Sequence, residues 1–382
     1  MPGNAHETIR QFKGENGIER QTLTMLQSSK QAGIKDIARA LNVSIGTVDR
    51  ALHDRPGVNE QTKYRVLQMA NKLGYRPNIA AQSLRLNRRI SIAAILPKEI
   101  SHFFDPLRAG IRAAAEATVG TQVALDFHEY PRLSVGEEEI FAKATSKHYD
   151  GIIFLPGNMR RFDPIISKLT RAGTAMMCVG SDAPNSDRIG SVATHAHVSG
   201  AIAAELLAMK MTKKANVAVF SGELSTMDHA EKLRGFASTL ALQAPHLSLL
   251  PTLESHERPT AAYKQAKQLM QSRNRPEGLY LSTANGIPVL RALEELGLLE
   301  KVHIVTTDLY HALIPLIELG KITATIHQRP FTQGKLAFEK LVAYLLGEDQ
   351  RQPYIRLAPH VVFRSNLSLF SSEVTDPSDA IV

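Results

Sequence analysis

The sequence contains one cysteine, Cys178, and no tryptophan in its 382 residues. A single cysteine excludes an internal disulfide and is typical of a protein that stays in a reducing compartment. The longest apolar runs, such as ISIAAILP and GIIFLP, have the length of strands, so we expect no membrane span. The first 21 residues are polar and hold no apolar segment like that of a secretory leader, which favours a cytoplasmic location.

Sequence motifs of common enzymes are also missing. We find no GxGxxG or GxxxxGKS/T phosphate loop, no GxSxG elbow and no HExxH pair. The acidic run at 137–139 falls on a predicted helix and is interpreted as a solvated face. Cys178 lies inside an apolar strand, where core packing is a better interpretation than nucleophilic catalysis. We therefore expect no catalytic residues, no metal ligands and no cofactor.

The net charge of +8 is concentrated in one short segment. Residues 34–89 hold 11 Lys and Arg side chains and four Asp and Glu side chains, whereas residues 90–382 carry equal numbers of both signs. A basic module on a neutral body predicts an electrostatic surface for a polyanion. On charge alone, a solvated lysine-rich face is the simpler alternative.

Three helical patterns follow one another in this basic segment. IKDIARAL (34–41) and SIGTVDRAL (44–52) place apolar residues at helical spacing on both sides of a tight turn, and NEQTKYRVLQMANK (59–72) continues the series. The first two patterns have the dimensions of a helix-turn-helix unit, with Ala38 and Val48 available to pack where the helices cross. Residues 1–33 show no sustained periodicity, and we expect them to be disordered.

From Ile90 onwards, apolar strands alternate with amphipathic helices. Eleven candidate strands, among them ISIAAILP, QVALDFHEY and LSLLPTL, span about 280 residues. This alternation is typical of βαβ units and of parallel sheets covered on both faces. Eleven strands are many for one open sheet, so we expect two α/β lobes, with ligands bound beyond the carboxyl ends of the strands.

The segment from Ile34 to Leu84 resembles the DNA-binding headpiece of the LacI/GalR family of transcriptional regulators. The shared elements are IKDIA, VS..TV.R.L, PGV...T..RV, LGYRPN and A..L. The remainder resembles the periplasmic-binding-protein-like body of that family, so the resemblance covers about nine tenths of the chain. It implies an all-α helix-turn-helix headpiece with a hinge helix, followed by a two-lobed α/β body of type I with parallel sheets.

The resemblance also implies domain boundaries and an assembly. The boundaries are an N-terminal extension at 1–33, the helix-turn-helix domain at 34–77, a hinge helix and linker at 78–89, a first lobe at 90–193 and 326–350, a second lobe at 194–325 and 351–368, and a flexible tail at 369–382. Because family members meet double-stranded DNA as symmetric dimers, a homodimer and a pseudopalindromic operator are expected.

In the family, the second helix of the headpiece enters the major groove. The matching contacts are Ser44, Ile45, Gly46, Thr47, Asp49 and Arg50. Ser44 and Thr47 can donate to phosphates, and Arg50 can reach a phosphate or a base edge. Ile45 and Gly46 occupy the two positions from which the family reads bases, and neither side chain can hydrogen-bond, so only apolar contact with a thymine methyl group remains there.

Asp49 stands where the family usually has a serine. Either it is a local partner for Arg50, Lys63 or Arg65, or it accepts a hydrogen bond from a cytosine amino group.

The stretch PNIAAQSL matches the family's hinge helix, which contacts the minor groove. The matching positions are Asn78, Ala81 and Leu84, and Leu84 stands at the position of the apolar wedge that kinks the duplex. Simple burial of Leu84 in a linker is the alternative.

For the body, the resemblance implies a small effector between the lobes, most commonly a sugar. Sugars require apolar platforms for their rings together with fixed donors and acceptors. Because tryptophan is absent, Phe or Tyr must supply any stacking, and SHFFD after the first strand offers Phe103 and Phe104. The other expected contacts lie at strand ends or on family motifs and are His195, Lys232, Thr283, Asn285, Asp308 and Gln328.

Two of these positions depart from the family pattern. Lys232 stands where an arginine is usual, which weakens the two-pronged clamp on a pair of hydroxyl groups. His195 and Ala196 replace a frequent Asp-Asn pair, so the ligand is expected to differ from simple pentoses or hexoses. A metal pair of His195 and His197 lacks further ligands at a suitable spacing, which favours His195 as a neutral hydrogen-bonding residue.

The residues and the resemblance together predict a sequence-specific, effector-responsive transcriptional regulator. Repression is favoured because the footprint alone can block transcription. The alternative is a solute-binding protein for transport or chemoreception, which shares the body but needs export and no headpiece. A sugar-processing enzyme is a third possibility, and the missing catalytic constellation argues against it.

Overall fold

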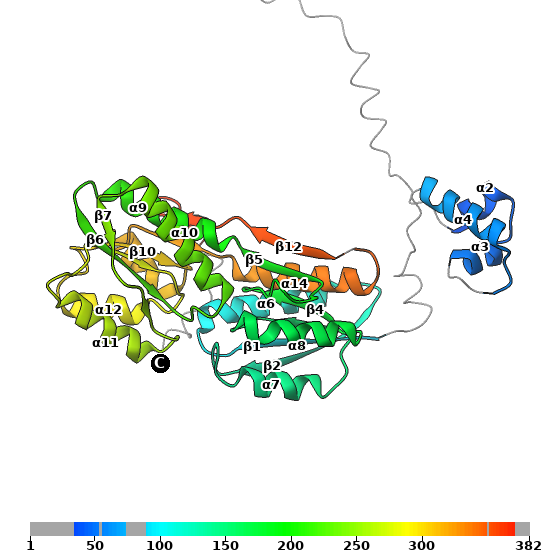
Figure 1. Ribbon diagram of the computed structural model, residues 1–382, viewed down its shortest axis with the longest axis horizontal. Helices are drawn as coiled ribbons and strands as arrows, with labels where there is room; N and C mark the ends of the chain where they lie inside the picture. The colour runs from blue at the N-terminus through cyan, green and yellow to red at the C-terminus, as the bar shows by residue number, and fades with distance from the viewer. Residues whose placement is uncertain (1–33, 53–55, 74–88, 350, 371–382) are drawn as a thin grey trace, which may run out of the picture. The chain divides into compact units, whose positions relative to one another are not determined.

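The computed structural model describes residues 34–52, 56–73, 89–349 and 351–370 (Figure 1). The predicted extension at 1–33, the hinge helix with Asn78, Ala81 and Leu84, and most of the predicted tail lie outside the described residues. The chain divides into two compact units, with the boundary after residue 78. The first unit is the headpiece and the second is the α/β body. Among the described helices, none is long and apolar enough to cross a bilayer.

Three described helices form the headpiece: α2 (Ile34–Leu41), α3 (Ile45–Leu52) and α4 (Glu60–Lys72). Their apolar positions meet in one core, made of Ile37, Ala38, Val48, Ala51, Val66 and Ala70. The turn between α2 and α3 passes through Asn42 in the left-handed region (φ 54°), which asparagine tolerates. Ser44 Oγ then caps α3 by accepting from Thr47 N–H at 3.0 Å. The helix-turn-helix unit predicted from the spacing is confirmed.

The first lobe of the body is built on a six-stranded parallel sheet with the order β12-β5-β4-β3-β1-β2. Its strands are β1 (Arg89–Pro97), β2 (Gln122–Tyr130), β3 (Gly151–Phe154), β4 (Ala175–Val179), β5 (Gly190–Thr194) and β12 (Gln352–Leu357). Its helices are α6 (Ser101–Ala117), α7 (Glu137–Thr145), α8 (Met159–Arg171) and α14 (Pro330–Leu345).

Alternate residues of β1 enter different cores. Ile92 and Leu96 pack with α6 and α14, whereas Ala93 and Ile95 pack with α7 and α8 on the other face. Burial of both faces explains why the inner strands β3 and β4 are continuously apolar in sequence, whereas the edge strand β2 also carries polar residues.

The second lobe has the same construction (Figure 1). Its sheet has the order β13-β11-β10-β9-β6-β7, with β8 also paired to β6, and only β13 runs antiparallel to its neighbour. The strands are β6 (Ala215–Ser221), β7 (Leu247–Leu249), β8 (Leu253–Glu254), β9 (Gly278–Leu281), β10 (His303–Thr307), β11 (Ala324–His327) and β13 (His360–Val362). One face packs with α11 (Pro259–Met270) and α12 (Ile287–Glu295), and the other with α9 (Ala196–Lys210) and α10 (Met227–Gln243). The short helices are η2 (His311–Leu313), α13 (Ile314–Glu318) and η3 (Leu367–Leu369).

The chain crosses between the lobes three times, from β5 to α9, from β11 to α14, and from β12 to β13. The predicted assignment of 351–368 to the second lobe was therefore wrong in part, because residues 352–357 form β12, which pairs in parallel with β5 of the first lobe. Residues 326–327 were likewise expected in the first lobe, but they end β11 in the sheet of the second.

Two more expectations are corrected. The stretch LSLLPTL forms two strands, β7 and β8, rather than one, because Pro251 between them has no N–H for a continuous ladder. The predicted flexible tail begins too early. Residue 369 ends η3, and the ring of Phe370 lies 6.3 Å from that of His327 and 5.5 Å from that of His360.

Each lobe contains one close helix crossing made by two glycines. In the first lobe α6 and α14 meet at Gly110 and Gly334, and in the second lobe α9 and α10 meet at Gly200 and Gly235. A Cβ atom placed on any of the four would lie 1.9–2.0 Å from a backbone oxygen of the opposite helix. Because glycine has no side chain, the two helix backbones can come into contact at each crossing. In the second lobe, this contact fixes the position of α10.

Candidate effector cleft and DNA-binding surface

The carboxyl ends of both sheets face a cleft between the two lobes of the body. The cleft holds about 430 Å³ of empty space, part of it open to solvent. Its lining residues follow β1, β2, β3 and β4 in the first lobe and β6, β8, β9 and β11 in the second. Parallel α/β sheets bind ligands at this end, so the cleft lies where the sequence pattern predicted it.

The wall from the first lobe is largely apolar. It consists mainly of Ile100, Phe103, Phe104, Leu133 and Leu155. Phe103 and Phe104 start α6 and pack edge to face, with ring centroids 5.0 Å apart. Both are more than nine-tenths buried, and the structure places both in the cleft wall, as predicted for ring platforms.

The wall from the second lobe is polar, and Glu257 lies at its centre. Its carboxylate accepts from Thr283 Oγ1 at 2.9 and 3.1 Å, and His229 Nε2 lies 3.5 Å away. Burial raises the pKa of Glu257, and the nearby His229 and the Thr283 hydroxyl oppose that rise. Asn285 supports the arrangement by donating its N–H to Thr283 Oγ1 and its amide to Glu257 O. Thr283 therefore lines the cleft as predicted, whereas Asn285 holds the loop behind it.

His229 connects the loop after β6 to Glu257. Its Nδ1 lies 2.9 Å from Glu223 N and 3.0 Å from Glu223 O. Its Nε2 lies 3.5 Å from Glu257 Oε1.

Lys232 does not line the cleft. It is 1% exposed, and its Nζ donates to Asp228 Oδ2 at 2.6 Å, one turn earlier on α10. Asp228 lines the cleft in its place. The lysine at the family's arginine position therefore pairs with and orients a carboxylate, and that carboxylate lines the cleft.

Asp308 also lies behind the wall. Its carboxylate accepts from Gln328 N–H at 3.1 Å and from Gln328 Nε2 at 2.7 Å, and only Gln328 reaches the cleft. Asp308 adopts a left-handed backbone (φ 66°) at the end of β10, which turns it towards the crossover. Of the two, Gln328 is placed to contact a ligand and Asp308 to position it.

His195 lies apart from the other predicted contacts. It caps the N-terminus of α9, where its Nδ1 accepts from Val198 N–H at 3.5 Å. It lines a neighbouring hollow together with Tyr354 and Arg356, and does not line the cleft itself. The structure therefore does not bring His195 together with Phe103 and Gln328.

His102 and Ser225 each join the two lobes beside the cleft. His102 Nε2 lies 2.6 Å from Ala284 O of the second lobe, and its ring centroid is 4.0 Å from that of Tyr310. Ser225 Oγ donates to Gly157 O of the first lobe at 2.8 Å and lies 3.4 Å from Ser134 Oγ of the same lobe.

Glu137 supports the second contact and corrects the prediction of a solvated acidic run. It is 4% exposed, and its Oε1 accepts from the N–H of Gly157 at 2.6 Å. Burial raises its pKa to about 7, and the carboxylate of Glu223 in the second lobe adds to the rise. The first residue of the acidic run is thus a buried group beneath the lobe contact.

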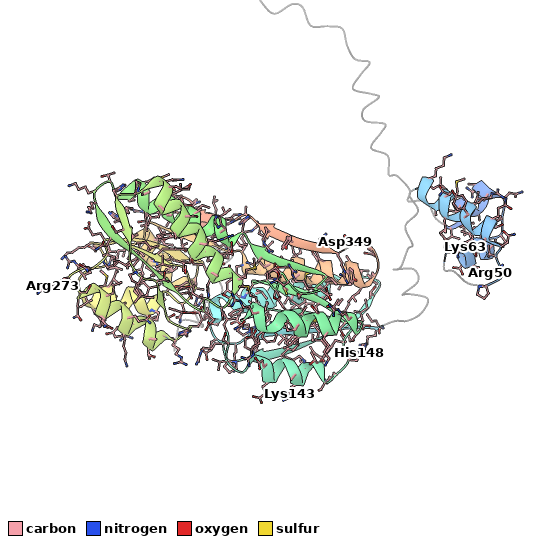
Figure 2. The ribbon with its side chains drawn as sticks, in the orientation of Figure 1. Arg50, Lys63, Lys143, His148, Arg273 and Asp349 are labelled. Atoms are coloured by element: carbon pink, nitrogen blue, oxygen red, sulfur yellow. The ribbon has the colours of Figure 1, made fainter. Side chains whose placement is uncertain are left out.

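The headpiece presents α3 as an open surface. Ile45 is half exposed, and Gly46 and Arg50 are exposed beside it. A Cβ atom on Gly46 would meet no atom closer than 3.8 Å, so packing does not require the glycine there. Ser44 and Thr47 share a hydrogen bond of 2.8 Å between their hydroxyl groups. Arg50 on α3 and Lys63 on α4 add positive charge to this unit (Figure 2).

Two protein-family models match this chain. Residues 33–78 match the bacterial regulatory proteins of the lacI family, and residues 92–349 match the periplasmic binding protein domain. Catabolite control protein A of Staphylococcus epidermidis is 24% identical over 337 residues, which cover 87% of this chain and 98% of that protein. The HTH-type transcriptional regulator RegA of Clostridium saccharobutylicum is 36% identical over 134 residues, covering 33% of this chain and 37% of that protein. The chain belongs to the LacI/GalR family.

Solved structures agree with this for the fold of the body. A glucose-galactose binding protein from Geobacillus stearothermophilus superposes with a TM-score of 0.67 at 24% identity, over 73% of this chain and 99% of that one. A solute-binding protein from Burkholderia graminis, in complex with D-arabinose, superposes with a TM-score of 0.66 at 23% identity, over 73% and 96%. The predicted fold, a helix-turn-helix headpiece followed by a two-lobed type I body, is confirmed. As a LacI/GalR member, the chain is a DNA-binding transcriptional regulator.

Several cleft residues of this LacI/GalR regulator were not found by sequence reasoning. They are Ser181, Thr226, Asp228, His229 and Glu257. Asp228 and His229 stand in the first turn of α10, directly before the matched motif that contains Lys232, so the start of that helix was an available signal. Glu257 offered no comparable signal, because it is an isolated acid in the loop after β8.

Proposed function

We propose that this LacI/GalR regulator acts in the cytoplasm as a homodimeric repressor on a pseudopalindromic operator, and that a sugar or sugar derivative between its lobes controls operator affinity. The effector part of the proposal rests on the different chemistry of the two cleft walls. One wall presents aromatic rings, and the other presents the buried carboxylate of Glu257, the partly buried carboxylate of Asp228 and the amide of Gln328. A polyhydroxylated ring has the matching chemistry, with C–H faces and hydroxyl donors.

The charges in the cleft favour a neutral effector. Asp228 and Glu257 are the acidic groups in its described lining, and no described Lys or Arg lines it. Lys232, which lies behind this wall, is already paired with Asp228 at 2.6 Å. Two carboxylates accept hydrogen bonds from hydroxyl groups, whereas they repel a phosphate or a second carboxylate.

The effector test is a thermal-shift screen of the full-length chain against pentoses, hexoses, sugar acids and sugar phosphates. A hit should raise the melting temperature, and Glu257→Gln should weaken its binding by about tenfold or more, because one charge-assisted hydrogen bond is worth roughly 1.5–3 kcal/mol. His148→Ala, an exposed position on the first lobe (Figure 2), is the matched control. Unchanged affinity in both Glu257→Gln and Gln328→Ala would place the effector elsewhere.

On DNA, we assign direct contacts to Ser44, Ile45, Gly46, Thr47, Asp49 and Arg50 of the headpiece. Ser44, Ile45, Gly46 and Arg50 are exposed on or immediately before α3, and this exposure together with the net positive charge of the segment supports the assignment. Asn78, Ala81 and Leu84, outside the described residues, keep the minor-groove role that the resemblance gives them.

Operator selection from a random DNA library, followed by fluorescence anisotropy, tests the DNA part. A palindromic consensus is expected, with affinity that falls steeply as salt rises. Leu84→Ala should lower specific affinity much more than non-specific affinity, since the wedge contributes only on a kinkable operator. Equal losses on both DNAs would contradict the wedge, and an asymmetric consensus would contradict the dimer.

A further inference from the structure

Three metal-ligating side chains gather at the rim of the second lobe. Glu223 follows β6, Glu254 ends β8, and His256 follows two residues later. Their oxygen and nitrogen ligand atoms all lie within 4.8 Å of one another. β6 and β8 pair in parallel, so their carboxyl ends bring the three residues together.

The spacing of the ligand atoms matches a tetrahedral metal site. Two ligands bound at about 2.0–2.1 Å and separated by a tetrahedral angle lie roughly 3.3 Å apart. His256 Nδ1 lies 3.2 Å from Glu223 Oε2 and 3.7 Å from Glu254 Oε1. With all three ligand atoms within 4.8 Å of one another, side-chain rotation can bring them around one ion.

The two carboxylates are already oriented by neighbouring groups. Glu254 Oε1 accepts from Leu224 N–H at 2.7 Å, and Glu223 Oε1 lies 2.9 Å from Ser225 Oγ. Such outer hydrogen bonds hold ligating carboxylates in place in metal sites. The His256 side chain is 57% exposed, which leaves room for a water molecule as the fourth ligand.

Glu223 and Glu254 place two carboxylates beside the ring of His256. A dication would offset this excess of negative charge, and an imidazole ligand selects Zn²⁺ over the hard ions Mg²⁺ and Ca²⁺.

We propose that Glu223, Glu254 and His256 bind one Zn²⁺ ion, which couples metal availability to closure of the lobes. The link is the single proton of Ser225 Oγ, which faces both Glu223 Oε1 at 2.9 Å and Gly157 O of the first lobe at 2.8 Å. A metal on Glu223 withdraws charge from its carboxylate. The Ser225 proton then favours Gly157 O, which strengthens the contact between the lobes.

The test is calorimetric titration of ZnCl₂ into the tag-free, chelator-treated full-length chain. One ion per chain is expected, and His256→Ala and Glu254→Gln should each weaken binding at least tenfold. His148→Ala, which removes an exposed histidine of the first lobe, should leave the affinity unchanged. Unaltered Zn²⁺ binding in both His256→Ala and Glu254→Gln, or no Zn²⁺ binding by the wild type, would overturn the proposal.

Co²⁺ provides a second, spectroscopic readout. The wild type should show the intense visible absorption of a four-coordinate Co²⁺ complex, and His256→Ala should lose it. A weak six-coordinate spectrum in the wild type would also overturn the tetrahedral site.

Discussion

Replacing Gly235 with alanine should destabilise the second lobe and disturb the polar wall of the cleft. The new Cβ atom would lie 2.0 Å from His197 O and 2.8 Å from the carbonyl carbon of that residue. Ordinary contacts begin near 3.4 Å, so α9 and α10 must separate locally by about 1.4 Å. The clash is between backbone atoms, and no flexible side chain can move away to relieve it.

The size of the effect follows from two opposing terms. Overpacking a well-packed core costs roughly 1–3 kcal/mol, and a backbone clash belongs at the upper end of this range. Alanine gains about 1 kcal/mol over glycine inside a helix. The net loss is about 2 kcal/mol, which corresponds to a fall in melting temperature of roughly 4–8 °C for a domain of this size.

Thermal unfolding and effector titration together test the reasoning. Ser238→Ala changes an exposed residue three positions later on the same helix and should shift the melting temperature very little. Because α10 carries Asp228 and His229 in its first turn, Gly235→Ala should also weaken binding of the effector found in the screen. A melting temperature equal to or above that of the wild type would show that the helices can separate without cost, and would refute the argument from close approach.

Three further predictions concern single groups. Burial raises the pKa of Glu137 from 4.5 to about 7, so the folded state holds a proton that the unfolded state has lost, and stability falls as the pH rises through that window. The free energy of unfolding, measured with urea, should therefore fall between pH 5 and pH 8 by up to about 3 kcal/mol more in the wild type than in Glu137→Gln. Parallel pH profiles of the two proteins would contradict this. Burial raises the pKa of the Cys178 thiol to about 12, so a thiol reagent at pH 8 should label the folded chain at least 100-fold more slowly than the chain in urea, and fast labelling would mean that β4 opens readily. Asp49→Ser should alter the base preferred at one operator position if Asp49 accepts from a cytosine amino group, whereas an unchanged consensus would leave Asp49 as a local partner of basic side chains.

Much of the fold could be predicted because hydrophobic spacing reports burial directly. The expected strand QVALDFHEY coincides with β2 (Gln122–Tyr130), and the three expected headpiece helices are present. Spacing does not report which sheet a strand joins. β12 was assigned to the wrong lobe because the chain crosses between two similar sheets, and its partner, β5, lies more than 150 residues away.

The cleft was harder to predict than the fold. Phe103, Thr283 and Gln328 line it as expected, because each follows or ends an element that points there. Lys232 and Asp308 lie one layer behind, since a sequence position cannot show whether a charged side chain meets the ligand or another side chain. Glu137 was misjudged for the same reason: its burial depends on the loop at Gly157, which comes from elsewhere in the chain.

The two lobes share one architecture but contribute unequally to recognition. In the second lobe, Asp228 is held by Lys232 and Glu257 by Thr283, so this polar wall is organised before any ligand arrives. The largely apolar wall of the first lobe offers mainly shape and exclusion of water. The second lobe would therefore orient a hydroxylated effector, and the first would close over it. The hydrogen bonds between the lobes include two to backbone carbonyls, at Ala284 and Gly157. Ala284 also lines the cleft, so closure of the lobes and the shape of the effector site are coupled at this residue.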